Sequence, residues 1–321
     1  MNNSRKTLAA AAIALLVGST AHAQERILIG SSSSSSSHYG YYVAVSQLIN
    51  DGVEGVSATV VETGATMDNM RRLQRNQIDM GLVTTNVAYD AWAGQGDFEG
   101  QPYKMLTLWV YSSAPQNVVV RQDAGLETIA DLAGQRINPG ITGSATEKTT
   151  EAVFAHLGVE PDWVRGSTGD VVDSIKDDRA VGYVKSGAGE RLDASSLDIA
   201  TLTPVSLISL DDEQAQSVTD AFPNLAVIEI GENAAGDGYP AYRTWAFGTA
   251  TVAHPEMSDD MAYAITKAAV EDETVQSAAF ANLKGSQLPD MTMALATSPL
   301  HPGAIRYFEE VGVEIPERLR P

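Results

Sequence analysis

Residues 27–42 read ILIGSSSSSSSHYGYY, a short apolar stretch that passes through Gly30 into seven serines and then into a tyrosine-rich segment. Three further short stretches end in small hydroxyl residues where a helix is expected to begin: 60–61 before Thr63–Thr66, 82–83 before Thr84–Asn86, and 136–138 before Thr142–Ser144. The first turn of a helix leaves backbone N–H groups unpaired and carries a partial positive charge. Several such starts at the ends of neighbouring strands predict a pocket of donors suited to a small anion.

Strand and helix patterns alternate along the chain, which predicts an α/β fold with largely parallel sheets flanked by helices. We expect strands at 80–84, 105–111, 117–121, 180–184, 225–230 and 244–252. We expect helices at 86–93, 127–132, 144–157, 170–178, 211–222, 258–282 (in one or two pieces) and 304–311, and a further helix starting at 66. We expect the segment 112–115 to separate the strands at 105–111 and 117–121.

The N-terminus has the features of an export signal. Arg5 and Lys6 precede the apolar run 8–17, and Ala21-His22-Ala23 follows the small-x-small rule for cleavage. The pattern predicts a signal peptide at 1–23, a mature chain from Gln24 and a periplasmic location. No other stretch approaches the length of a membrane span, and without cysteine no lipid anchor can form, so we expect no stable membrane anchor.

Charge and composition exclude several functions. The chain has 41 acidic and 21 basic residues, a formal charge of −20, and cleavage after residue 23 would leave −22. Nucleic acid and anionic membranes are therefore not expected as partners, because both require a basic surface. The absence of cysteine excludes thiol chemistry and thiolate metal sites. Histidines beyond residue 23 have no metal-ligand spacing, so we predict neither metal nor cofactor.

Signatures of catalysis are missing. The segment around Ser144 reads Thr-Gly-Ser-Ala-Thr rather than Gly-x-Ser-x-Gly, and no Walker or dinucleotide-binding glycine pattern occurs. We predict that the protein is not an enzyme and has no catalytic residue. A periplasmic hydrolase remains an alternative hypothesis.

About three hundred mature residues exceed one typical domain, which favours two lobes. The break at 112–115 and the segment 236–244 are the candidate crossings between them. The predicted organisation is a signal peptide at 1–23, a first lobe formed by 24–112 and 244–321, and a second lobe formed by 113–243. We expect a monomer.

Several candidate ligand-binding residues follow from the residues themselves. The serine run is either a flexible linker or a loop of the cleft that brings Ser36 and Ser37 to the ligand. Tyr39 can offer a ring and a hydroxyl, whereas His38 is expected to be a surface or loop residue. In the strongest local anion site, Ala145 and Thr146 would offer their N–H groups and Thr142 its hydroxyl. Ser144 is a candidate ligand-binding residue or a simple helix cap. Lys185 is either the partner of a ligand carboxylate or a solvated lysine.

A family resemblance rests on segments spread over nearly the whole mature chain. These segments are Glu62–Asn69, Gln77–Val83 with Asn86–Tyr89, Asn117–Arg121, Asp131–Arg136, Gly143–Glu147, and Leu300–Ala304 with Tyr307. In order and spacing they resemble the TAXI-type solute receptors of tripartite ATP-independent periplasmic (TRAP) transporters. The sequence differs from the family in its first loop, where serines stand in place of the usual glycines.

The resemblance implies a two-lobed periplasmic binding protein, type II-like, with the ligand in the cleft between its lobes. It implies a receptor that captures a small carboxylate, such as glutamate, 2-oxoglutarate or a related dicarboxylate, and delivers it to a TRAP permease. Matching positions place near the ligand Tyr39, Thr63, Ala65, Thr66, Asn86, Tyr89, Thr142, Ser144 and Ala145. A binding protein of an ABC importer and a sensor domain are alternative hypotheses.

Overall fold

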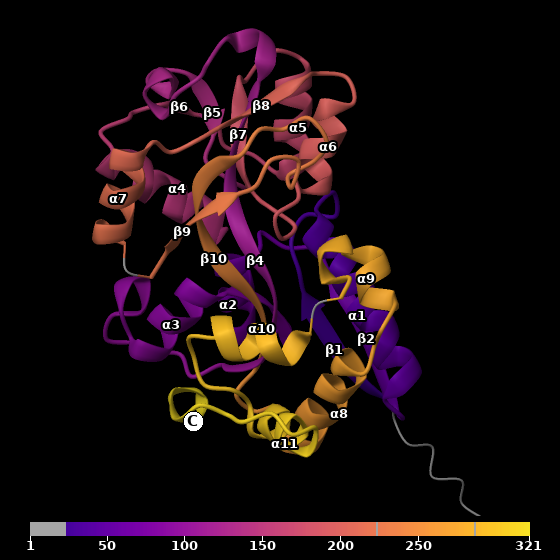
Figure 1. Cartoon of the computed structure of the whole chain (residues 1–321). Coiled ribbons are helices and arrows are strands. Elements are labelled where there is room, and N and C mark those ends of the chain that lie inside the picture. Colours follow the sequence, from indigo (N-terminus) through magenta and orange to yellow (C-terminus); the bar gives the residue numbers. More distant parts are fainter. Residues whose placement is uncertain (1–23, 223, 286) are drawn as a thin grey trace, which may run out of the picture.

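Two long strands, β4 and β10, form the axis of the molecule. The computed structural model describes residues 24–222, 224–285 and 287–321, so the predicted signal peptide lies outside the described residues. β4 (Leu106–Arg121) and β10 (Tyr242–Ala253) pair antiparallel and run through both halves of the molecule (Figure 1). The predicted break at 112–115 is wrong, because 112–115 pair with β10 inside one continuous strand.

The first half contains three parallel strands, with β1 between β2 and β3. Its elements before β4 are β1 (Glu25–Gly30), α1 (Ser37–Gly52), β2 (Val56–Val61), α2 (Thr66–Gln74), β3 (Met80–Thr84) and α3 (Thr85–Ala93). Four C-terminal helices return to this half: α8 (Asp259–Val270), α9 (Val275–Ala279), α10 (Leu288–Leu295) and α11 (Pro302–Glu310). β3 is buried along its whole length, as expected of a strand between neighbours on both sides.

The second half is built in the same manner on the other end of β4. It contains β5 (Arg136–Asn138), α4 (Ala145–His156), β6 (Asp162–Trp163), α5 (Thr168–Lys176), β7 (Gly182–Ser186), α6 (Ala194–Ala200), β8 (Val205–Ile208) and α7 (Asp212–Ala221). β5 lies parallel to β6 and β7, whereas β7 and β8 pair antiparallel with β4, and β9 (Ala226–Ile230) pairs antiparallel with β10. The sheet is therefore mixed rather than largely parallel.

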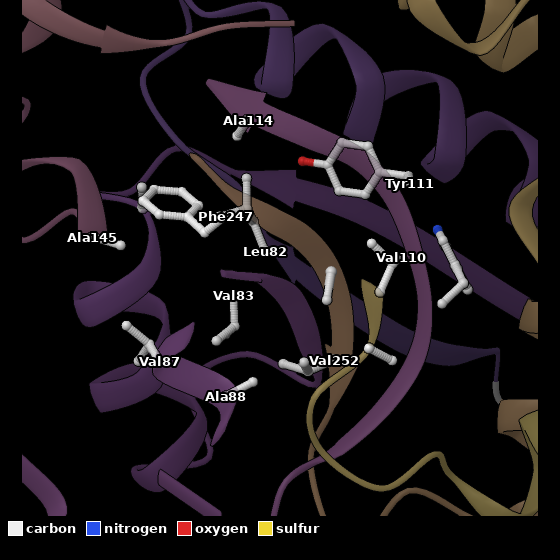
Figure 2. Close-up of a cluster of buried hydrophobic side chains, with 14 of the residues drawn as sticks. Leu82, Val83, Val87, Ala88, Val110, Tyr111, Ala114, Ala145, Phe247 and Val252 are labelled. Atoms are coloured by element: carbon white, nitrogen blue, oxygen red, sulfur yellow. The ribbon is translucent and has the colours of Figure 1, made fainter. Parts of the chain in front are cut away.

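The hydrophobic core is continuous across both halves. Figure 2 shows part of it, where side chains of β3, β4 and β10 meet α3 and the start of α4. A smaller cluster lies beneath α5 and α6 and includes Val171, Ile175 and Ile199. At the far end of β4, Arg121 donates to Asp123 and lies 3.5 Å from Asp178. The two halves are therefore joined by a shared core around β4 and β10.

Candidate ligand-binding site

A small cavity lies between the two halves, where the N-termini of the five helices α1 to α5 meet. Its volume is about 30 Å³, close to the space of one water molecule. The walls come from the β1–α1 loop, the starts of α2, α4 and α5, the ends of β3 and β7, and the middle of β10. The lining residues are Ser32, Ser33, Ser36, His38, Ala65, Thr66, Leu82, Thr84, Ile141, Ser144, Ala145, Thr146, Thr168, Val184, Lys185, Ser186, Phe247 and Thr249.

The serine run is a folded loop of this cavity rather than a linker. Ser32, Ser33 and Ser36 are buried and line it, whereas Ser34 and Ser35 are exposed at the turn. The N–H and Oγ of Ser34 both donate to Glu62 Oε1, at 2.7 and 3.0 Å, which ties the loop to the end of β2. The small side chains let the backbone fold closely over the end of the sheet.

The start of α2 is held in an unusual backbone conformation. Ala65 has φ 63° and ψ −146°, a region that L residues rarely adopt, and its N–H donates to Thr63 Oγ1 at 3.1 Å. Here the two halves touch, because Met67 N–H donates to Gly143 O at 2.8 Å. A Cβ on Gly64 would lie 2.7 Å from Thr142 O, so this approach requires glycine.

The start of α4 faces the cavity from the second half. Ser144 caps the helix by accepting from Glu147 N–H at 3.0 Å, and Glu147 Oε2 accepts from Gly143 N–H at 2.7 Å. Ala145 and Thr146 follow directly and line the cavity. In Figure 2 the ring of Phe247 lies between Ala145 and Leu82, which gives this wall an apolar surface.

Four buried polar atoms in the lining have no hydrogen-bond partner among the described residues. They are Ser32 Oγ, His38 Nε2, Thr66 Oγ1 and Thr84 Oγ1. Each of the four residues is at most 5% exposed. Buried polar atoms are almost always paired, since an unpaired one costs about 1–3 kcal/mol. Because four such atoms lie around one cavity, this cavity is the candidate ligand-binding site.

Lys185 is buried in the cavity wall and paired with an acid. Its Nζ lies 3.4 Å from Asp193 Oδ1 and donates to Ser36 Oγ at 3.2 Å, so it is not the solvated lysine of one interpretation. Asp193 is fully buried, and burial alone would raise the pKa of its carboxyl. The charge of Lys185 and bonds from Ser195 outweigh that effect and lower this pKa to about 2. The site therefore holds one cation balanced by one anion.

His38 also belongs to the cavity, which corrects the expectation of a surface or loop residue. It is 3% exposed, and its Nδ1 lies 3.0 Å from Tyr111 Oη. Burial, with a smaller contribution from the charge of Lys185, lowers the pKa of His38 to about 4. The ring is thus neutral at pH 7 and can form an uncharged hydrogen bond through Nε2.

The structure brings seven of the thirteen predicted ligand-binding residues to the cavity. These are Ser36, Ala65, Thr66, Ser144, Ala145, Thr146 and Lys185. The other six do not line it: Ser37, Tyr39, Thr63, Asn86, Tyr89 and Thr142. Ser37 bonds with Asp193 and Ala194, Thr63 supports Ala65, and Thr142 is exposed. Asn86 and Tyr89 instead line a neighbouring pocket of about 510 Å³ beside α3.

Sequence reasoning missed the lining residues on strands and on α5. Leu82, Val184, Phe247 and Thr249 lie within predicted strands, where an inward side chain cannot be distinguished from one that lines a cavity. Thr84, by contrast, directly follows the apolar stretch 82–83 and ends β3, so its position in the sequence indicates a place at the cavity. Asp193 gave no sequence signal at all.

Across 24–222, 224–285 and 287–321, no three His, Asp or Glu side chains are placed to hold a metal ion. In the same part of the chain, no helix combines the length and the apolar character that a bilayer crossing requires.

Comparison with known proteins places this architecture in a family. The model of the NMT1-like family matches residues 29–312, and the chain belongs to that family. Its fold is the α/β fold of solute-binding proteins, with a mixed sheet and flanking helices.

Two solved structures illustrate the likeness. A chain from work on glutathione import through the cystine ABC importer of Streptococcus mutans superimposes with a TM-score of 0.51 at 14% identity, over 84% of this chain and 98% of that one. The zinc-bound ligand-binding component of an ABC-type import system from Staphylococcus aureus superimposes with a TM-score of 0.51 at 11% identity. The match covers 93% of this chain and 97% of that one. At such identities the likeness concerns the fold alone.

Proposed function

We propose that the protein is a non-enzymatic, extracytoplasmic receptor that captures a small carboxylate and delivers it to a membrane permease. The observation that carries the proposal is the set of four unpartnered polar atoms around one cavity between two halves. Helix starts and Lys185 supply donors for a carboxylate, while Leu82 and Phe247 supply an apolar wall for the carbon skeleton. A predicted signal peptide at 1–23 supports export to the periplasm.

The ligand contacts proposed for this function are the seven predicted residues that line the cavity, joined by Ser32, His38 and Thr84. The remaining six, Ser37, Tyr39, Thr63, Asn86, Tyr89 and Thr142, would contact ligand only in a more open arrangement. A cavity of about 30 Å³ cannot hold a dicarboxylate, so binding requires the halves to separate. We place the moving parts at 24–112 with 244–321 and at 113–243, hinged on β4 and β10.

Two classes of permease are candidates. Both solved structures described above come from work on ABC import systems, which favours an ABC importer as the partner. The segments that resemble TAXI-type receptors, such as Glu62–Asn69, support a TRAP permease instead. Uptake into vesicles containing the candidate permease separates them: an ABC importer requires ATP inside the vesicle, whereas a TRAP permease does not.

Calorimetric titration of residues 24–321 with dicarboxylates, keto acids and amino acids tests the receptor function. We expect saturable binding of at least one organic acid, and thermal stabilisation that grows with its concentration. If no acid of the panel binds or stabilises the protein, the proposed function is wrong. A periplasmic hydrolase would instead show turnover that Ser144→Ala abolishes without loss of binding.

A further inference from the structure

The cavity offers no acidic group to a bound molecule. None of its eighteen lining residues is Asp or Glu, although the chain as a whole has 41 acidic residues. The polar lining consists of hydroxyl groups, one imidazole and the Lys185 ammonium. An amino acid carries an ammonium group whose burial without an anionic partner is costly. The Lys185 ammonium, already paired with Asp193, carries no acceptor for such a group.

The acid nearest to the lining, Asp193, has its oxygens taken. Oδ2 accepts from Ser36 Oγ at 3.0 Å and from Ser37 N–H at 2.9 Å. Oδ1 accepts from Ser195 N–H at 3.0 Å and from Ser195 Oγ at 2.6 Å, and it also faces Lys185. While Ser36 and Ser37 of the other half remain bound to it, this carboxylate has four hydrogen bonds and an ion pair, and therefore no free lone pair for a ligand.

Three further acids near the cavity are also bound by groups of the protein itself. Glu62 binds the backbone and hydroxyl of Ser34. Asp68 accepts from Gly64 N–H and pairs with Arg72. Glu147 accepts from Gly143 N–H and pairs with Arg165. The negative charges nearest to this cavity are thus bound to the protein itself.

The unpartnered atoms in the lining suit an oxygen on the carbon next to a carboxylate. Hydroxyls of Ser32, Thr66 and Thr84 can donate to a carbonyl oxygen or exchange hydrogen bonds with a hydroxyl group. His38 Nε2 offers one further uncharged hydrogen bond. With two of its three N–H groups directed at Ser36 and Asp193, Lys185 keeps one for the ligand carboxylate.

We propose that the site selects 2-oxo or 2-hydroxy carboxylates over the amino acids of the same skeleton, because its lining can hydrogen-bond an oxygen atom but offers no carboxylate to balance the charge of an ammonium group. This inference rests on the proposed receptor function and names its ligand class. The proposed ligand class differs from that of a binding protein whose site offers a free carboxylate to the amino group of its ligand.

Matched ligand sets provide the test. Calorimetry of residues 24–321 compares L-glutamate with 2-oxoglutarate and 2-hydroxyglutarate, and L-alanine with pyruvate and lactate. In at least one set we expect the oxo or hydroxy acid to bind about 10-fold more tightly or better, the usual effect of one unpaired buried group. Equal or tighter binding of the amino acid overturns the inference and leaves the receptor function intact. If none of the six compounds binds, the inference is wrong. The titration with the wider panel of acids then shows whether the proposed receptor function still holds.

Two variants sharpen the test by adding a carboxylate to the lining. Thr84→Asp and Thr66→Asp place an acid at cavity positions where aspartate suits a helix start. Either variant, if folded by circular dichroism, should move the preference toward the amino acid by about 10-fold. Thr59→Asp is the matched control, since Thr59 is exposed on β2 and lies outside the lining. A shift of the same size in Thr59→Asp, or no shift in either cavity variant, contradicts the inference.

Discussion

The helix starts of α1 and α4 have the same sequence character but different surroundings. Each follows a short strand and a hydroxyl-rich segment, and each has a serine N-cap, Ser36 or Ser144. At α1, Ser36 Oγ and Ser37 N–H both donate to Asp193 of the second half. At α4, the first residues Ala145 and Thr146 face the cavity.

The contact at α1 is reciprocal, because Ala194 N–H at the start of α6 donates to Ser37 Oγ at 2.8 Å. Each half thus caps a helix of the other. The α1 start serves mainly to hold the halves together, and the α4 start remains available to a ligand. The same local pattern therefore forms a contact between the halves at α1 and lines the cavity at α4, according to whether an acid from the opposite half reaches it.

Removal of the Asp193 carboxylate is the strongest way to break the α1 contact. Asp193→Ala leaves Lys185 buried without its counter-charge, and we expect the free energy of unfolding in urea to fall by about 3–5 kcal/mol. Asp198→Ala is the control on the same helix, because Asp198 is exposed and pairs only with Lys176 at 2.8 Å; its cost should stay below about 1 kcal/mol. Equal costs for the two variants would mean that Asp193 does not hold the halves.

A pH series tests the environment of His38 beside the α1 start. Burial lowers the pKa of His38 from 6.5 to about 4, so between these values the unfolded chain binds a proton that the folded chain does not. Stability therefore rises with pH through this window, and acidification from pH 7 to pH 5 should cost about 2 kcal/mol through this residue. In His38→Gln that part of the slope should vanish. An unchanged slope would show that His38 titrates normally.

Substitution of the two capping serines compares the helix starts directly. Ser144→Ala removes one N-cap hydrogen bond and should cost about 1 kcal/mol. Ser36→Ala removes an N-cap bond and also the bond to Asp193, and should cost about 1 kcal/mol more. Urea unfolding of the two variants under one set of conditions gives the difference. If Ser144→Ala is the more damaging change, the assignment of closure to α1 is wrong.

Much of the fold could be predicted from local signals. The strand at 80–84, the helix start at Thr66 and the helix that follows Ser144 are confirmed, because buried strands and capped helices leave short-range patterns. The expected break at 112–115 failed for a physical reason. Its polar and proline residues normally end a strand, but here they pair with β10, and the same strand continues at Gln116 into its pairing with β7, so long-range pairing outweighs local preference.

The site was predictable only in part. Hydroxyl residues after strands identified the right loops, since small hydroxyl residues are common where helices begin, as at the Ser36 and Ser144 caps. Which starts meet a ligand depends on residues far away in the chain, and Asp193 is 157 positions from Ser36. The prediction that His38 lies on the surface or in a loop was wrong, because the sequence around a single histidine does not show that Tyr111 and Phe280, far away in the chain, pack against its ring.

The smallest effect concerns the α4 side of the same closure. Lys148 in α4 lies 2.5 Å from Asp97 of the first half, but both side chains are about half exposed, so water and salt screen the pair. A double-mutant cycle of Lys148→Ala and Asp97→Ala should give a coupling below about 1 kcal/mol, and this coupling should fall further when salt is raised. The buried α1 contact should change little with salt, because its charges are shielded from the solvent. A coupling at α4 as large as the Asp193 effect would place the closure of the two halves on the exposed side of the molecule and reverse the comparison of the two helix starts.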